Sequence, residues 1–207
     1  MPRRLTATLA LAAVTAAAFL VILLSGSADA ASLGMGFMPA RVTLDVSWPA
    51  LPVWLTPLSA TLVHGGFLHL AMNLLLLVWC GREVERILGP VPVLLLYVAG
   101  AYAAAAGQYV LDPLAPYPMV GASGAISALV GAFAMSFSRP KAIVRNFRLN
   151  RAINTVWMLL AWVILQWMTG YLMGTQGIAV ATGAHVGGFI AGVVLHRPLL
   201  LWRYRRA

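Results

Sequence analysis

Ser123 has neighbours that favour chemistry at its hydroxyl. It lies within Gly121-Ala122-Ser123-Gly124, where the glycines let neighbouring backbone come close and leave the hydroxyl unobstructed at the start of a helix, near free N–H groups. A serine needs a base before it can attack a carbonyl near neutral pH. Gly121, Ser123 and Gly124 therefore predict a nucleophile with oxyanion donors beside it. The alternative is a patch of small residues that packs membrane helices together.

His185 is the candidate base. Gly188 and Gly192 follow it at i+3 and i+7 on the same helical face, so its helix can pack tightly against the one that carries Ser123. The alternative is a histidine that only bonds a neighbouring carbonyl. No Asp or Glu lies inside an apolar run, so we predict a Ser–His dyad and not a triad with a buried carboxylate.

Three more polar residues precede this pair in the chain. His69 and Asn73 are four residues apart on one helical face, which suits two donors that stabilise an oxyanion, each worth ~3 kcal/mol. His64 lies off that face and is expected to support the site by ordering the outer loop or water. A metal site of His64, His69 and His185 is the alternative, but no intramembrane carboxylate and no HExxH pattern accompanies them. No metal and no cofactor is expected.

The composition requires lipid around these residues. The 207 residues are 61% hydrophobic and only 9% charged, against about 25% charged in soluble domains. Several apolar runs reach the ~20 residues that a helix needs to cross a bilayer. The net charge of +9 is concentrated in short segments between these runs, which is typical of membrane topology and not of nucleic-acid binding.

The apolar runs predict an all-α membrane protein of six transmembrane helices, in one domain that covers residues 1–207. The expected spans are 5–25, 60–80, 92–110, 120–138, 152–172 and 178–200. Residues 26–59, with several prolines and tryptophans, are expected to lie at the outer membrane interface, and 201–207 form a basic cytoplasmic tail.

Charge sets the orientation of these spans. Thirteen of the fourteen basic residues fall on one side, and Arg41 alone falls on the other, so both termini are expected in the cytoplasm. The basic residues on the inner side are Arg3, Arg4, Arg82, Arg86, Arg139, Lys141, Arg145, Arg148, Arg151, Arg197, Arg203, Arg205 and Arg206. The bacterial inner membrane is the expected location. A cleaved signal peptide ending near residues 28–30 is the alternative for the first span, whose apolar stretch exceeds the usual signal core of ~7–15 residues.

With this orientation His69, Ser123 and His185 lie at the same depth. The second, fourth and sixth spans all begin at the outer face of the membrane. The three residues lie near the starts of these spans, so they fall in the outer part of the bilayer. Polar side chains are costly there and mark functional sites by default.

These motifs together resemble the rhomboid family of intramembrane proteases. The matching pattern is His64-x4-His69-x3-Asn73, then Gly121-x-Ser123-Gly124, then Ala184-His185-x2-Gly188-x3-Gly192, each near the start of alternate spans. Glu85-x3-Gly89 fits the turn after the family's second span. The resemblance covers about 64–192 and implies the six-helix rhomboid fold, the Ser123–His185 dyad, and oxyanion contacts at His69, Asn73 and the Ser123 backbone.

The sequence departs from the family in two places. Trp54 is followed by Leu55 where the family often has a Trp-Arg pair, so the anchoring of the outer loop is expected to differ. Ser127 stands where the family commonly has an aromatic beneath the histidine. Two outcomes are open: His185 is held less firmly, or another side chain such as Phe133 or Phe189 fills that space.

The predicted function is a serine endopeptidase that cleaves the transmembrane segments of other membrane proteins, so its partners are such substrates and the lipid bilayer. Two alternatives remain open. One is an inactive rhomboid-like protein that binds or escorts membrane clients, and the other is a small transporter, for which midplane broken helices or paired ionisable groups are expected but not found.

Overall fold

The computed structural model describes residues 6–45, 48–137, 141–175 and 180–205. In this part of the chain all regular elements are helical, apart from one isolated antiparallel bridge between Phe37 and Met119. Some predicted features lie outside the described residues. They are the basic residues Arg3, Arg4, Arg139 and Arg206 and the predicted span ends at 5, 138 and 178.

Six apolar helices form the bundle, as predicted. They are α1 (Ala7–Leu24), α4 (Phe67–Leu88), α5 (Pro90–Leu111), α6 (Ser123–Phe137), α7 (Phe147–Gly174) and α8 (Thr182–Arg203). Within the described residues five of them are long and apolar enough to cross a membrane, and α6, with 15 residues, is a shorter apolar helix. The prediction of an all-α, multi-pass membrane protein is confirmed.

The predicted bounds of the second span were wrong at both ends. Residues Ala60–Leu62 form a 3₁₀ turn, η2, and α4 begins only at Phe67, because Gly65 and Gly66 interrupt the apolar run. The helix then continues past residue 80 to Leu88, since nothing breaks it before Gly89 and Pro90. His64 therefore lies in the connection before α4 and not in the span.

The fourth span was also predicted to start too early. Helix α6 begins at Ser123 and not at residue 120, because the residues before it bond to the outer segment instead of to the helix. The Met119 N–H donates to the Phe37 carbonyl at 2.7 Å, and the Gly121 N–H donates to the Ala60 carbonyl at 2.9 Å. These bonds place Ser123 at the first position of its helix.

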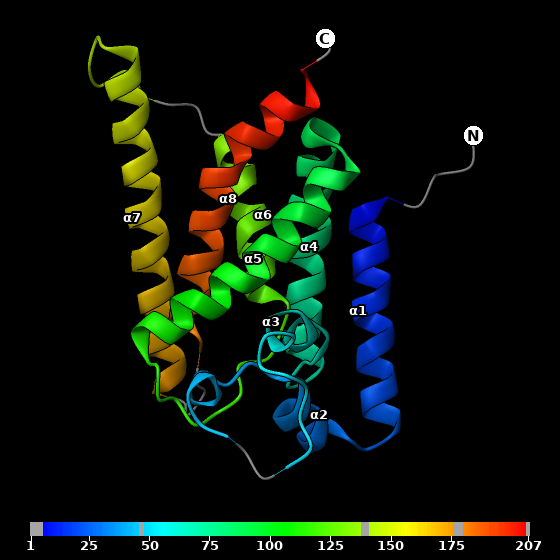
Figure 1. Cartoon of the computed structure of the whole chain (residues 1–207). Helices are drawn as coiled ribbons and strands as arrows, with labels where there is room; N and C mark the ends of the chain where they lie inside the picture. Colours follow the sequence, from blue (N-terminus) through cyan, green and yellow to red (C-terminus); the bar gives the residue numbers. More distant parts are fainter. Residues whose placement is uncertain (1–5, 46–47, 138–140, 176–179, 206–207) are drawn as a thin grey trace, which may run out of the picture.

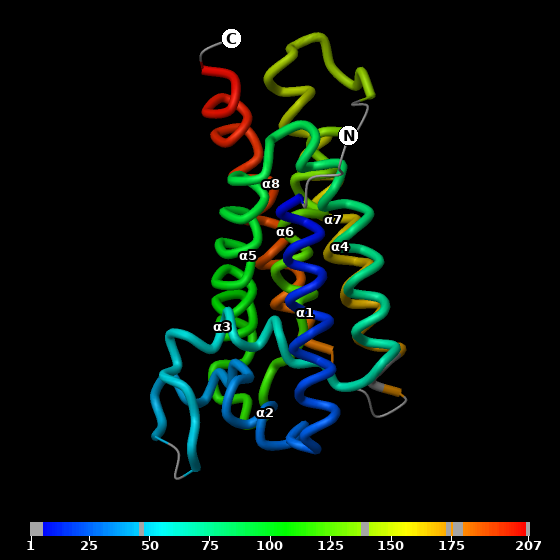
Figure 2. The backbone as a smooth tube through the Cα atoms, turned by 90° about the vertical axis from the view of Figure 1, so that its right-hand side faces the viewer, coloured from blue at the N-terminus to red at the C-terminus, as the bar shows by residue number. Residues whose placement is uncertain are grey.

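Helices α5, α6 and α8 make the centre of the bundle (Figure 1). Helix α4 packs on α6, α1 lies beside α4 at one side, and α7 stands beside α8 at the other. The tube view in Figure 2 shows the start of α1 and the end of α8 at the same end of the bundle. We call this the basic end, and the opposite end, where α6 and α8 begin, the site end.

Small residues allow α6 and α8 to touch through their backbones. A Cβ added at Gly188 would lie 2.0 Å from the Gly124 carbonyl oxygen, and one added at Gly192 would lie 2.0 Å from that of Ala128. Helices in lipid associate through such close van der Waals contact, because lipid tails are as apolar as the side chains. The glycines that follow His185 thus join its helix directly to the helix of Ser123.

Glu85 holds the start of α1 against α4. Its carboxylate accepts hydrogen bonds from the backbone N–H groups of Ala7 and Thr8, at 2.9 and 3.0 Å, and from the Thr8 hydroxyl at 2.6 Å. These N–H groups belong to the first turn of α1 and have no partner inside the helix, and a negative charge is favourable there. The bond explains why a charged residue occurs near the end of an apolar helix.

The segment between α1 and α4 covers the site end. It contains α2 (Ala28–Met35), the 3₁₀ turn η1 (Pro39–Val42), α3 (Thr56–Ser59) and η2. Side chains anchor it: the Ser59 hydroxyl donates to the Met35 carbonyl at 2.7 Å, and the Tyr102 hydroxyl of α5 donates to the Trp54 carbonyl at 3.1 Å. Arg41 donates to the Leu51 carbonyl at 2.7 Å, so this arginine takes part in anchoring although no Trp-Arg pair is present.

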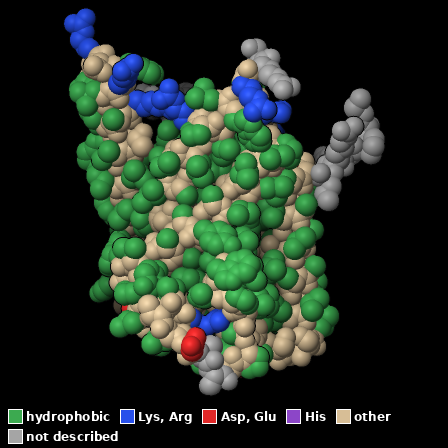
Figure 3. Space-filling view, in the orientation of Figure 1, with side chains coloured by type: hydrophobic (Ala, Val, Ile, Leu, Met, Phe, Trp, Pro, Cys, Tyr) green, Lys and Arg blue, Asp and Glu red, His purple; other side chains and the backbone are tan. Residues whose placement is uncertain are grey.

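The sides of the bundle are apolar, and most of the lysine and arginine side chains visible in Figure 3 gather at one end. Large hydrophobic side chains such as Leu75, Val110, Trp157 and Val194 are more than half exposed, which is the surface that lipid covers. Helix α7 is the least embedded: 6% of its apolar window is buried inside the protein, against 44% for α5. Its position therefore depends on few contacts.

The contact between α6 and α8 predicts a large effect of adding bulk there. Gly192→Val is expected to lower the free energy of unfolding by more than about 2 kcal/mol, because the added carbons meet the Ala128 backbone, which cannot yield as a side chain can. Thermal unfolding in detergent micelles measures this. The matched control is Ala106→Val on the exposed face of α5, which is expected to leave the midpoint unchanged. Equal midpoints for both variants would contradict the packing argument.

Candidate active site

Ser123 and His185 meet at the site end of the bundle. The Ser123 Oγ lies 2.8 Å from His185 Nε2, which is hydrogen-bonding distance. Ser123 is the first residue of α6, and His185 lies in the first turn of α8. Two residues 62 positions apart are thus brought together by the backbone contact of Gly188, one turn after His185, with Gly124, the residue after Ser123.

The start of α6 presents unbonded N–H groups beside the Ser123 hydroxyl. Within the helix the first bond to close is that from the Ile126 N–H to the Ala122 carbonyl, at 2.9 Å, so the N–H groups before Ile126 have no helical partner. The helix dipole also favours negative charge at this position. Both features suit an oxyanion that forms next to the serine.

His69 lies against the loop that precedes the serine. Gly121 has a φ of +110°, and a Cβ at this position would lie 2.7 Å from two atoms of the His69 ring, so only glycine fits both the backbone and the space. The Gly65 N–H donates to His69 Nδ1 at 3.4 Å, which leaves Nε2 on the side of Gly121. The structure therefore brings His69 to the same place as Ser123 and His185.

Asn73 is placed differently from the prediction. It is buried, and its side-chain nitrogen donates to the His69 carbonyl of its own helix at 2.8 Å. It does not line the cavity that contains Ser123 and His185. In this arrangement Asn73 supports the turn of α4 that carries His69, and its oxygen has no partner among the described residues.

His64 bonds to the backbone next to the nucleophile. Its Nε2 accepts from the Ala122 N–H at 3.5 Å, and its ring meets that of His69 edge-on with centroids 5.0 Å apart. Burial, and after it the neighbouring His69, lowers the pKa of His64 from 6.5 to about 4. His64 is therefore neutral at physiological pH and able to accept this bond.

A cavity of about 930 Å³ opens onto the pair at the site end. Ser123, His185, His69, Gly121 and Gly124 all line it. Water has to reach a hydrolytic site inside a membrane, and a partly polar cavity of this size has room for both water and an extended peptide segment. Gly188 and Gly192 lie outside the cavity wall and act through the packing of the two helices.

Sequence reasoning did not assign Gln166 to the site. This residue is buried on α7, and its Oε1 lies 2.6 Å from His185 Nδ1. A glutamine inside an apolar span is an exceptional residue, which was the available signal, but its sequence position does not say which helix it faces.

The aromatic residues near His185 were predicted in part. Phe189 stacks on Trp162 of α7, with ring centroids 4.7 Å apart, one turn after His185. Phe133 packs against Trp79 and Phe137 instead, so it does not fill the space beneath the histidine. Ser127 donates to the Ser123 carbonyl of its own helix at 2.8 Å.

The described part of the chain contains no set of ligands for the metal site that was considered as an alternative. No group of three His, Cys, Asp or Glu side chains lies close enough there to hold an ion. The donors that the site offers are a hydroxyl, imidazoles, an amide and backbone N–H groups, and these suit acyl transfer.

Bundle and cavity together define a multi-pass membrane protein with a serine–histidine pair at one end, and comparison with known proteins identifies its family. Residues 52–202 match the rhomboid domain. The chain belongs to the rhomboid family.

Named relatives come from bacteria, plants and animals. The chain is 30% identical over 146 residues to the rhomboid protease GluP of Bacillus subtilis, an alignment that covers 70% of this chain and 27% of GluP. It is 32% identical over 137 residues to the rhomboid protease GlpG of Haemophilus influenzae, covering 66% of this chain and 65% of GlpG. Mouse rhomboid-related protein 2 is 31% identical over 143 residues, covering 66% and 45% of the two chains. The chain thus spans from about a quarter to two thirds of the length of these relatives.

The lowered pKa of His64 predicts a pH dependence of stability. The unfolded chain takes up a proton on His64 near pH 6.5, whereas the folded chain does so only near pH 4, so stability falls as the pH drops through this window. His64→Gln keeps an acceptor for the Ala122 N–H but does not titrate. The thermal midpoint in micelles is expected to fall less between about pH 7 and pH 5 in this variant than in the wild type. Equal falls would show that His64 binds its proton alike in both states.

Proposed function

We propose that the protein is an intramembrane serine endopeptidase that cleaves transmembrane segments of other membrane proteins. The observation that carries the proposal is the 2.8 Å contact between Ser123 Oγ and His185 Nε2 inside a cavity at the site end of a membrane bundle. Membership of a family whose named relatives include proteases supports it.

The chemistry follows from the positions of the groups. Ser123 Oγ attacks the carbonyl carbon of the scissile peptide bond while His185 Nε2 takes the hydroxyl proton. The oxyanion that forms is held by His69 and by the unbonded N–H groups at the start of α6. His185 then gives its proton to the leaving amine, and an acyl-enzyme at Ser123 remains.

Water completes the reaction. A water molecule in the cavity gives a proton to His185 and attacks the acyl carbon. His185 then returns this proton to Ser123 Oγ as the acyl bond breaks, which releases the new carboxyl terminus and restores the Ser123 hydroxyl. Since a peptide bond inside an intact helix is shielded, the substrate segment has to unwind to reach Ser123. Substrates with helix-weakening residues near the cleaved bond are therefore proposed.

The orientation in the membrane follows the charge. Among the described residues, most lysine and arginine side chains lie at the basic end, so we propose that this end faces the cytoplasm, with both termini there and the site end outside. A bacterial inner membrane fits this proposal, because two of the named relatives are bacterial proteins.

Cleavage of a reporter transmembrane protein in proteoliposomes tests the activity. Wild type is expected to release a shortened product and to react with a fluorophosphonate probe. Ser123→Ala removes the nucleophile and His185→Ala the base, so each is expected to lower kcat by more than about 10⁴-fold. Ser127→Ala is the matched control, because its hydroxyl lies on the same helix and bonds only to its own helix.

The same experiment separates the protease from the inactive alternative. A wild type that neither cleaves nor reacts with the probe, under conditions that label the Haemophilus influenzae relative, would favour a protein that binds or escorts membrane clients. If the Ser123→Ala variant still cleaved the reporter, Ser123 would not be the nucleophile and the proposed mechanism would be wrong.

A further inference from the structure

A row of three polar side chains runs across three helices at the site end. Ser123 of α6 lies 2.8 Å from one nitrogen of His185 on α8, and Gln166 of α7 lies 2.6 Å from the other. Gln166 is only 7% exposed, so this contact is shielded from water and from lipid. Both ring nitrogens of the imidazole therefore have a defined partner.

The row specifies one tautomer of His185. A base for Ser123 has to present an unprotonated Nε2, so in the neutral ring the proton resides on Nδ1. The Gln166 Oε1 is an acceptor without a proton of its own, and it can bond only to a protonated Nδ1. The amide oxygen thus stabilises the tautomer that leaves Nε2 free to accept the hydroxyl proton.

Helix α7 makes two further contacts with α8 beside this bond. Trp162, four residues before Gln166 and on the same face, donates its ring N–H to the His185 carbonyl at 3.2 Å and stacks on Phe189. These contacts hold the backbone, the ring and the following turn of α8 near His185. The rest of α7 is hardly embedded, so the contacts at Trp162 and Gln166 define its position.

We propose that Gln166 is the positioning residue for the base, in the place that a carboxylate has in a serine–histidine–aspartate triad. The proposal rests on the proposed proteolytic function and deepens it. An amide orients the imidazole without a second buried charge, which would be costly at this depth in a membrane. The five acidic residues of the chain, Asp29, Asp45, Glu83, Glu85 and Asp112, all lie outside this row.

Kinetics of Gln166 variants test the role. Gln166→Leu keeps the size of the side chain but removes the acceptor, and kcat is expected to fall by about 10²–10⁴-fold with little change in KM, as when a triad loses its orienting member. Gln166→Glu restores an acceptor and is expected to recover at least part of kcat. A carboxylate also favours the imidazolium, so the acidic limb of its pH profile is expected to move to higher pH. His69 is the other titratable side chain that acts on His185 and is unchanged in these variants.

The control is Thr169→Val, one turn along α7. The Thr169 hydroxyl donates to the Leu165 carbonyl of its own helix at 2.8 Å, so its loss perturbs α7 without touching His185. Wild-type kcat in Gln166→Leu, or equal losses in Gln166→Leu and Gln166→Glu with an unchanged pH profile, would overturn the positioning role. A wild type without protease activity would instead overturn the proposed function, so the two failures differ.

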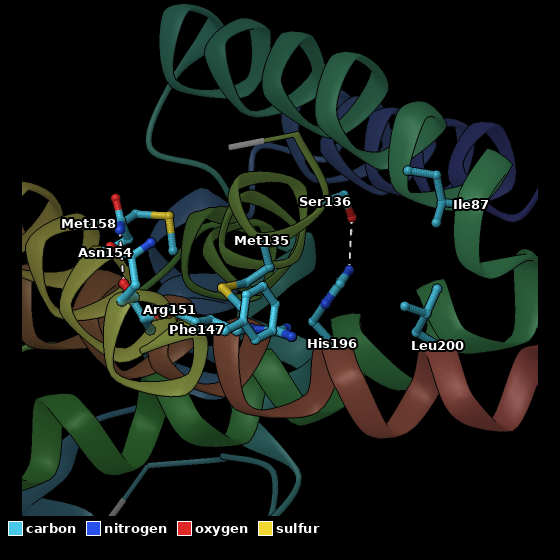
Figure 4. A pocket seen from close by; sticks show the side chains of 11 residues that line it. Ile87, Met135, Ser136, Phe147, Arg151, Asn154, Met158, His196 and Leu200 are labelled. Carbon is cyan, nitrogen blue, oxygen red and sulfur yellow. Dashed lines mark hydrogen bonds between the residues drawn. The ribbon is translucent and has the colours of Figure 1, made fainter. Parts of the chain in front are cut away.

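A second observation lies at the basic end and is independent of the protease. A cavity of about 350 Å³ opens between α6, α7 and α8 (Figure 4). One part of its wall is apolar, with Met135, Phe147 and Leu200, and another part is formed by Arg151 and His196. Such a mixture of a cation and apolar side chains suits a ligand with an anionic head and a hydrocarbon part.

His196 is a buried polar group whose bonding is incomplete. It is 4% exposed, and its Nε2 lies 2.9 Å from the Ser136 Oγ. Since the Ser136 hydroxyl donates to the Ala132 carbonyl, it accepts from Nε2–H, and His196 Nδ1 has no partner in the described part of the chain. Protonation would turn Nδ1 into a donor, and a nearby anion would favour that state.

The acidic residues at this end are bonded elsewhere and do not compensate the charge of the cavity. Glu83 pairs with Arg86, and Glu85 bonds to the start of α1, so both acidic residues of this end are engaged. Arg151 has no acidic partner among the described residues, and further lysine and arginine side chains gather at the same end in Figure 3.

We infer that this cavity binds the phosphate of an anionic phospholipid from the leaflet at the basic end. Arg151 holds the phosphate, His196 lies in the same wall, and the first acyl carbons contact Met135, Phe147 and Leu200. The apolar wall and its place in a membrane-spanning bundle favour a lipid over free phosphate.

Native mass spectrometry of the full chain tests the lipid site. Phosphatidylglycerol is expected to stay bound where phosphatidylcholine does not, and Arg151→Gln is expected to weaken this binding about fivefold. Arg145→Gln removes an exposed charge that does not line the cavity, and it is expected to have a smaller effect. Equal binding of both lipids, or equal loss in both variants, would overturn the inference. Full displacement by inorganic phosphate would assign the cavity to a free anion instead.

Discussion

Gly188 and Gly192 of α8 lie directly against the backbone of α6, and the site depends on this contact. Because neither glycine carries a side chain, carbonyl oxygens of α6 come within 2.0 Å of the place where a Cβ would be. At that separation an imidazole on one helix reaches a hydroxyl on the other, so the Ser123–His185 bond follows from backbone packing one turn away. Lipid supplies no hydrophobic force between helices, so this fit has to come from shape.

The surrounding lipid also explains why the polar residues bond in rows. A polar group inside an apolar medium is costly unless it has a partner, and water reaches only the cavity. His64 therefore bonds the loop before Ser123, and Gln166 bonds the far nitrogen of His185. These bonds define the orientation of the His64 and His185 rings. In a site open to solvent, water would compete for the same hydrogen bonds.

The prediction from sequence succeeded for properties that depend on residues close together in the sequence. Apolar runs identified six helices in the right order, and the glycines around Ser123 and His185 indicated helices in close contact. It failed at Gly65 and Gly66, where a continuous apolar run hides a break, so His64 was assigned to a span. The placement of Asn73 also differed, because residues on one helical face can still point to different neighbours.

By itself the sequence determined that the chain spans a membrane, how many apolar helices it has, and which residues have the chemistry for catalysis. These follow from hydrophobic length and residue type, which are local quantities. The tertiary structure alone decided that Gln166 contacts His185, which follows it 19 positions later in the sequence. It also decided that Arg151 and His196 line the same cavity. The physical reason is that a contact between helices depends on how each helix rotates and slides against its neighbours, and the periodicity of one helix does not contain that information.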